Sequence, residues 1–128
     1  MIKKNTGPIL MKKKEKQFVV RSKIWIEDMH GKVAFGLGRF RMLEAIDRFG
    51  SMQAAARQLK MSYRSIWCRI RESEERIGRE IVVRHGKGSS LTPFARELMQ
   101  RFVELKESVS SAADERFDHL LAGSLRDS

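Results

Sequence analysis

The chain has 128 residues, enough for one domain with a modest hydrophobic core. Its 26 lysines and arginines outnumber its 16 acidic residues, and the formal charge of +10 favours a polyanionic partner. No apolar run approaches the roughly 20 residues of a membrane-spanning helix, and the basic start has no signal-peptide hydrophobic stretch, which argues against a membrane protein. Cys68 is the only cysteine and cannot form an internal disulfide, so we expect a reducing, cytoplasmic location.

Residues 1–16 carry six lysines and one glutamate and show no hydrophobic periodicity. They are predicted to form a disordered basic arm. A solvated tail is the simpler role for this arm, and added attraction to DNA is the alternative.

A β-hairpin is predicted next. Residues 17–26 are rich in β-branched and aromatic side chains that alternate through Ile24 and Ile26, which predicts a strand. A turn at residues 28–31 leads to a second strand at residues 32–35. Trp25 lies on the opposite face from Ile24 and Ile26, where it either contacts a partner subunit or covers the hairpin.

The following segment predicts a one-sided helix. The Gly-x-Gly at residues 36–38 lacks the third glycine of a dinucleotide site and the lysine and hydroxyl of a phosphate loop, so a flexible turn explains it. Apolar residues recur every third position from Phe40 to Phe49, and Gly50 suits the end of a helix over residues 39–49. We expect this helix to pack across the back of the next two.

Residues 51–77 carry the central motif. Two helices are predicted, over residues 52–59 and 63–77, joined by a three-residue turn, which is the spacing of a helix-turn-helix. Ser51 and Ser62 each precede a helix, where a hydroxyl can accept a backbone N–H. Ala55 and Ala56 let the second helix cross closely.

The second helix of the motif has two different faces. Its inward stripe is predicted to contain Met61, Tyr63, Ile66, Trp67 and Ile70, and its other face carries Arg64, Ser65, Cys68, Arg69 and Arg71. A hairpin that only builds a core would show the same pattern. The arginines, with few acids in the first two turns, favour a helix that reads DNA.

Two short strands around the basic tip at residues 85–88 predict a β-wing over about residues 81–92. Arg84 and Lys87 flank its glycines and could reach phosphates or the minor groove. A plain hairpin loop would look the same, but its place directly after the helical pair favours a wing.

The last helix is predicted to begin at Pro93, capped by Thr92, and to carry an apolar stripe as far as Leu121, with Gly123 after it. A helix over residues 93–121 is about 40 Å long, too long for one small core to cover, so the stripe implies a second chain. The alternative, a helix folded back on its own domain, accounts for the first half only. The predicted dimer contacts are Trp25, Phe94, Leu98, Phe102, Leu105, Val109 and Phe117.

With hairpin, three helices, wing and long helix in this order, the chain resembles the N-terminal winged-helix domain of the ModE family of molybdate-responsive regulators. The match covers about residues 23–102 and is carried by KIWIE, FGLGRFRMLEAI, GSMQAAARQL, MSYRSIW and LTPFARELM. LysR-type regulators are more distantly similar, sharing the helix-turn-helix and the LTPFA-like exit. The resemblance implies that Ser51, Arg64, Ser65 and Arg69 lie near DNA, with Arg84 and Lys87 on the wing.

Two departures from the family pattern alter the expected function. Full-length family members have C-terminal oxyanion-binding modules, which this chain lacks after its long helix, so we expect no direct molybdate binding. The wing tip HGKGSS is also shorter than the Gly-rich loop common in the family.

The predicted fold is α+β and mostly α, a winged helix-turn-helix over residues 17–92 with a dimerisation helix over 93–122 and a tail over 123–128. The predicted function is that of a homodimeric, sequence-specific DNA-binding transcriptional regulator. The predicted DNA contacts are Ser51, Arg57, Lys60, Ser62, Arg64, Ser65, Arg69, Arg84 and Lys87. Arg64 and Arg69 suit paired bonds to guanine, and Arg57, Lys60, Arg84 and Lys87 suit the DNA backbone.

Two other functional classes fit part of this pattern. A nonspecific architectural DNA binder would share the charge and the fold, and a winged-helix adaptor would bind another protein through Trp25 and the long helix. An enzyme is disfavoured, because the three histidines are far apart and have no metal-ligand companions at suitable spacing. We therefore expect no catalytic site, cofactor or metal.

Overall fold

The structure is a computed structural model that describes residues 18–127, so the predicted basic arm at residues 1–16 lies outside the described residues. The chain forms two compact units. One unit is Ile24–Val103, and the other combines the described parts of Met1–Lys23 and Glu104–Ser128.

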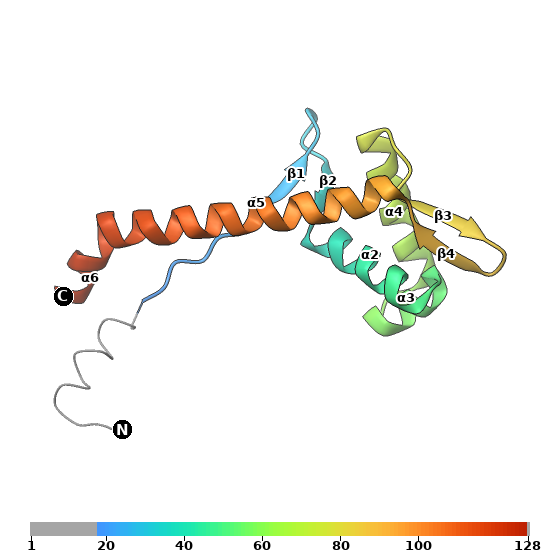
Figure 1. The fold of residues 1–128 in the computed structure, drawn as a ribbon, viewed down its shortest axis with the longest axis horizontal. Coiled ribbons are helices and arrows are strands. Elements are labelled where there is room, and N and C mark those ends of the chain that lie inside the picture. The colour runs from blue at the N-terminus through green and yellow to red at the C-terminus, as the bar shows by residue number, and fades with distance from the viewer. Residues whose placement is uncertain (1–17, 128) are drawn as a thin grey trace, which may run out of the picture. The chain divides into compact units, whose positions relative to one another are not determined.

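The unit Ile24–Val103 has the element order of a winged helix-turn-helix, as predicted (Figure 1). Its elements are β1 (Trp25–Glu27), β2 (Val33–Gly36), α2 (Leu37–Phe49), α3 (Met52–Leu59), α4 (Tyr63–Ile77), β3 (Val82–His85), β4 (Gly88–Leu91) and the start of α5 (Pro93–Phe117). The pairs β1–β2 and β3–β4 are separate antiparallel hairpins.

The first predicted strand is much shorter than expected, because only Trp25–Glu27 pairs. Trp25 is already opposite Gly36, the last residue of β2, and the chain then turns into α2, so the residues before Trp25 have no partner strand. The turn between the strands is held by Asp28, whose carboxylate accepts backbone N–H bonds from His30 and Lys32. These bonds, with the one from Lys32 the stronger influence, lower the pKa of Asp28.

The interpretation of Gly36 and Gly38 as a flexible turn was wrong. Helix α2 begins at Leu37, two residues earlier than predicted, and Gly38 lies inside it. Gly36 is instead closely packed against β1, since a Cβ there would lie 3.1 Å from the Cβ of Trp25, which would have to move by a few tenths of an ångström. Gly50 does end the helix as expected, in the left-handed conformation.

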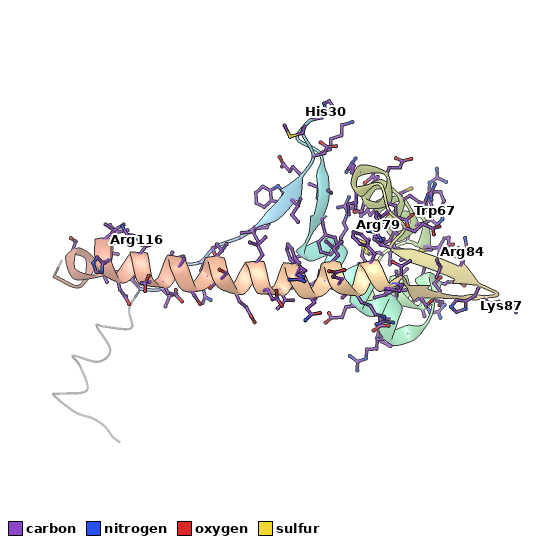
Figure 2. The ribbon with its side chains drawn as sticks, turned by 45° about the horizontal axis from the view of Figure 1, so that its top comes forward. His30, Trp67, Arg79, Arg84, Lys87 and Arg116 are labelled. Atoms are coloured by element: carbon purple, nitrogen blue, oxygen red, sulfur yellow. The ribbon has the colours of Figure 1, made fainter. Side chains whose placement is uncertain are left out.

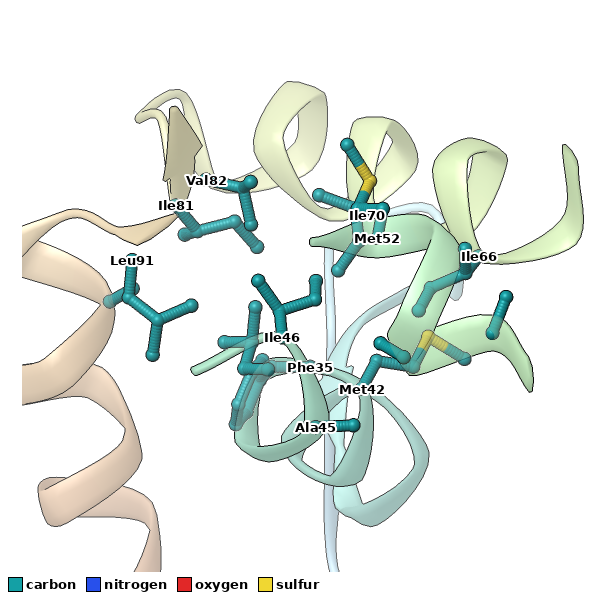
Figure 3. Packing of buried hydrophobic residues seen from close by; sticks show 14 of the residues in the cluster. Phe35, Met42, Ala45, Ile46, Met52, Ile66, Ile70, Ile81, Val82 and Leu91 are labelled. Atoms are coloured by element: carbon teal, nitrogen blue, oxygen red, sulfur yellow. The ribbon is translucent and has the colours of Figure 1, made fainter. Parts of the chain in front are cut away.

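The core lies where α2, α3 and α4 meet the base of the wing and the first turns of α5 (Figure 3). Its fully buried side chains include Phe35, Leu43, Ile46, Ile66, Ile70 and Ile81. Ala55 and Ala56 are buried at the α3–α4 crossing, as the sequence predicts. Small side chains at this crossing let the two backbones approach closely.

Two residues predicted to face the core are exposed. Tyr63 and Trp67 have 38% and 39% of their surface accessible, whereas Ile66 and Ile70 are buried. At about 100° per residue, Tyr63 and Trp67 lie roughly 35° and 75° from the centre of the arc formed by the buried Ile66, Ile70, Ser73 and Glu74. Trp67 is therefore at the margin of the buried arc, and Tyr63 is the first residue of the helix, so helical spacing alone does not distinguish buried from exposed positions here. Phe49, at the end of α2, is exposed as well.

The first turns of α5 pack on their own domain. Phe102, predicted as a dimer contact, is only 2% exposed, and its ring meets that of Phe35 edge-on at 5.2 Å. Leu98 and Phe94 also pack against the core, and the guanidinium of Arg79 lies 4.2 Å from the centre of the Phe94 ring. The apolar positions before Val103 therefore complete this core, as the second interpretation of the stripe allowed.

Beyond Phe117 the chain continues as a π-helical turn at Asp118–Ala122 and then as α6 (Gly123–Asp127). The prediction that the helix stops at Gly123 and that a tail follows was wrong, because Gly123 has helical dihedral angles. In this unit Phe18, Val19 and Val20 line a hollow together with Phe117 and Ala122.

We expect Ala56→Leu to lower the free energy of unfolding by about 1 to 3 kcal/mol, because the added atoms overpack the α3–α4 crossing. Urea unfolding followed by circular dichroism measures this change. Ala112→Leu, at an exposed position of α5, is the matched control. Equal stability of the two variants would contradict the close crossing.

Candidate nucleic-acid interface

The helix-turn-helix is fixed by two hydroxyl caps, both predicted. The Ser51 hydroxyl accepts the N–H of Ala54, and the Ser62 hydroxyl accepts the N–H of Ser65, each at 3.0 Å. Between the helices Lys60 takes a left-handed conformation, φ 57°, which closes the turn. Ser51 thus fixes the start of α3, and Ser62 fixes the start of α4.

The exposed side of α4 carries the predicted DNA-reading residues. Arg64 and Arg69 are exposed and Ser65 is half-buried, and with Ser62, Cys68 and Glu72 they line a shallow hollow. The one carboxylate of this hollow, that of Glu72, pairs with Arg39 at 3.0 Å. Burial lowers the pKa of Arg39, and the nearby charge of Glu72 opposes that shift. The hollow therefore keeps a positive character.

Along α4 the charges are segregated. Its first nine residues, YRSIWCRIR, contain three arginines and no acid, and its acids, Glu72, Glu74 and Glu75, follow in the second half. Positive charge is concentrated at the end of the helix that Ser62 caps, as a surface facing phosphates requires.

Glu74 attaches the wing to α4. Its carboxylate is buried, and Oε2 accepts the backbone N–H groups of Ile81 at 2.9 Å and Val82 at 3.2 Å. Its other oxygen lies 3.3 Å from the guanidinium of Arg71. This role of Glu74 was not predicted from the sequence. Its position could have indicated burial, because Glu74 is four residues after Ile70 and therefore lies on the same side of the helix.

The wing also docks on the junction between α2 and α3. The N–H of Ser89 donates to the Gly50 carbonyl at 2.8 Å, and a Cβ at Gly88 would lie 2.9 Å from the same oxygen. Only glycine at residue 88 permits this approach. The wing is thus joined to α4 and to Gly50, the residue that ends α2 directly before the Ser51 cap.

The predicted wing cations are exposed on β3 and at the tip (Figure 2). Arg84 and Lys87 line one hollow together with Ser51, Gln53 and Tyr63, so the structure brings the wing beside the starts of α3 and α4. Arg57 and Lys60, also predicted contacts, are exposed at the other end of α3. Sequence reasoning missed Gln53 and Tyr63 as surface residues.

Of the remaining predicted dimer contacts, Leu105 is exposed, and Val109 and Phe117 are half-buried, within the unit that contains Glu104–Ser128. Trp25 is half-exposed on β1, and its indole N–H donates to the Glu27 carboxylate at 2.7 Å. This bond fixes the indole along the hairpin surface.

Over residues 18–127, no cluster of three His, Cys, Asp or Glu side chains has the arrangement of a metal site. None of the described helices combines the length and apolar character needed to span a bilayer.

We expect Glu74→Ala to cost about 1 to 3 kcal/mol of stability, because two buried N–H groups lose their acceptor. Hydrogen exchange at Ile81 and Val82 should accelerate more than exchange in α2. Glu75→Ala, the exposed neighbour, is the control and should change neither quantity. Unchanged exchange at the wing would contradict the anchoring role.

Comparison with known proteins finds sequence similarity to bacterial regulators. Residues 37–96 match the model described as bacterial regulatory helix-turn-helix protein, lysR family. The chain is 31% identical over 96 residues to the molybdenum transport protein ModE of Azotobacter vinelandii, an alignment that covers 69% of this chain and 36% of that protein. The chain thus spans about a third of this relative's length.

Solved structures share the fold. A crystal structure of a CbnR DBD–DNA complex aligns with a TM-score of 0.53 and 20% identity, covering 66% of this chain and 98% of that one. A BenM DBD complex with benA site 1 DNA aligns with a TM-score of 0.50 and 20% identity, covering 73% and 100%. The resemblance to ModE and LysR-type domains inferred from the sequence is thereby confirmed.

Proposed function

We propose that this chain, which carries a LysR-type helix-turn-helix and is ModE-like in sequence, is a sequence-specific DNA-binding transcriptional regulator that acts as a homodimer. In this proposal α4 enters the major groove, and the wing formed by β3 and β4 contacts the backbone or the minor groove.

The observation that carries the proposal is the placement of charge. The acid-free first half of α4 exposes Arg64 and Arg69, and the wing exposes Arg84 and Lys87 beside the start of the same helix. A helix of this diameter fits the major groove, and cations on a neighbouring hairpin suit the adjacent phosphates. The fold is shared with CbnR and BenM domains that were crystallised with DNA, which supports the same partner here.

The predicted contacts fall into two roles under this proposal. Arg64 and Arg69 are the candidates for paired hydrogen bonds to guanine O6 and N7, and Ser65 for a base edge or a phosphate. The backbone contacts are assigned to Ser51, Arg57, Lys60, Ser62, Arg84 and Lys87. These residues give affinity that falls as the salt concentration rises.

The homodimer is supported by the apolar residues that remain on the far part of α5. Leu105 is exposed and Val109 lies one turn further on the same stripe. An exposed apolar stripe of this kind is covered when two such helices pack.

We expect Arg64→Ala to reduce the preference for a selected DNA site over random duplex by about 1 to 3 kcal/mol, since a base contact is lost. The site is first obtained by selection from random duplexes, and fluorescence anisotropy at near-physiological salt then measures both affinities. Arg101→Ala on α5 is the charge-matched control and should leave the preference unchanged.

The outcomes separate the rival functions. Equal weakening of selected and random DNA would remove the base-reading role of Arg64. If selection returns no preferred sequence while the wild type binds all duplexes, the architectural function replaces the regulator. If the wild type binds no DNA, the chain is an adaptor for another protein.

We expect the wild type to sediment as a dimer at micromolar concentration and Leu105→Asp to shift it toward monomer, because a buried charge in the stripe is costly. Ser108→Asp, at an exposed neighbouring position, is the control and should leave the dimer intact. A monomeric wild type would contradict the homodimer.

A further inference from the structure

A groove runs between α4 and the wing, here named the helix–wing groove. Near the wing tip Gln53, Tyr63, Arg84 and Lys87 line it. Further along, its lining includes Trp67, Arg71, Val83 and again Arg84. Met52 and Arg84 line both hollows, so the two hollows are adjacent parts of this groove.

The α4 wall of this groove carries two aromatic side chains. Tyr63 and Trp67 are one helical turn apart and both are more than a third exposed. A structural role in the core does not explain them, since Ile66 and Ile70 already fill that side of the helix. Figure 2 shows Trp67 at the same end of the molecule as Arg84 and Lys87.

Arg71 is held in place at the same wall. Its guanidinium lies 5.8 Å from the centre of the Trp67 ring and 3.3 Å from the Glu74 carboxylate. Half of the Arg71 side chain remains exposed. Because Glu74 also binds the wing backbone, one buried carboxylate positions both the wing and this arginine.

Positive charge faces the groove from both walls, with Arg71 on α4 and with Arg84 and Lys87 on the wing. Two acids line it as well. Glu74 is occupied by its hydrogen bonds, and Glu80 is exposed near the base of β3. The three cations outnumber the two acids, so the groove suits an anion that contacts cations on both walls.

We propose that the helix–wing groove seats the sugar–phosphate backbone of one DNA strand. Arg71 and Arg84 contact phosphates from the two walls, and Trp67 and Tyr63 pack against the sugars between them. This inference rests on the proposed function and adds Trp67, Arg71 and Tyr63 to its contacts. The anionic phosphates and less polar sugars of a DNA strand match a groove lined by both cationic and aromatic side chains. A backbone contact has no sequence preference, in contrast to the role of Arg64.

Trp67 provides a direct readout, because the chain has only two tryptophans and the other, Trp25, is on β1. In Trp25→Phe the fluorescence comes from Trp67 alone. We expect duplex DNA of random sequence to reduce the quenching of this signal by acrylamide. In Trp67→Phe, which reports on Trp25, quenching should be the same with and without DNA.

The charge readout uses the salt dependence of affinity for the same random duplex. Each lost phosphate contact lowers the slope of log K against log salt by about 1. We expect that loss for Arg71→Ala, no loss for Arg71→Lys, which keeps the charge, and no loss for Arg101→Ala. Thermal melts of each variant verify that the wing is still folded.

Failure of this inference is distinguishable from failure of the proposed function. If the wild type binds no duplex, both the proposed function and the groove contact are wrong. A wild type that binds DNA while Trp67 stays fully accessible and Arg71→Ala keeps the wild-type slope overturns only the groove. Shielding of Trp25 instead of Trp67 would also overturn it, because the strand would then lie on the β-hairpin.

Discussion

The arrangement of the wing against α4 depends on the hydrogen bonds of the buried Glu74 carboxylate. A charged group out of water is stable only when its hydrogen bonds are satisfied, and here Ile81, Val82 and Arg71 supply the donors. Those donors belong to the wing and to α4 itself. One side chain therefore sets the distance between the two elements that would hold DNA.

Two further constraints make the same assembly rigid. The Gly50 carbonyl accepts the Ser89 N–H, which fixes the wing to the junction between α2 and α3. Thr92 caps α5 through its hydroxyl and also donates to the Glu80 carbonyl. The wing is thus tied at its base to α5 and near its tip to the helix-turn-helix. Such pre-organisation lowers the entropy lost when a surface binds a partner.

Helix α5 combines two environments along one stripe of apolar residues. Up to Phe102 the stripe completes the core of its own domain, where the Phe102 ring contacts those of Phe35 and Phe40. Beyond Val103 the same spacing continues in a separate unit, with Leu105 exposed. One periodic pattern can thus include residues buried within a domain and exposed residues suited to a partner. The pattern alone does not show where along the helix the first kind gives way to the second.

The order of elements, the bounds of α3 and α4, both serine caps and the crossing alanines could all be predicted from the sequence, because these features depend on contacts between residues close in the chain. Other features depend on residues that are distant in the chain. Strand β1 is short because the residues before it have no partner strand, and Phe102 is buried against Phe35. Tyr63 and Trp67 are exposed on α4. The wing's attachment through Glu74 joins neighbours in sequence, yet only the fold shows that this carboxylate points inward to the wing backbone, since a glutamate on a helix is usually solvated.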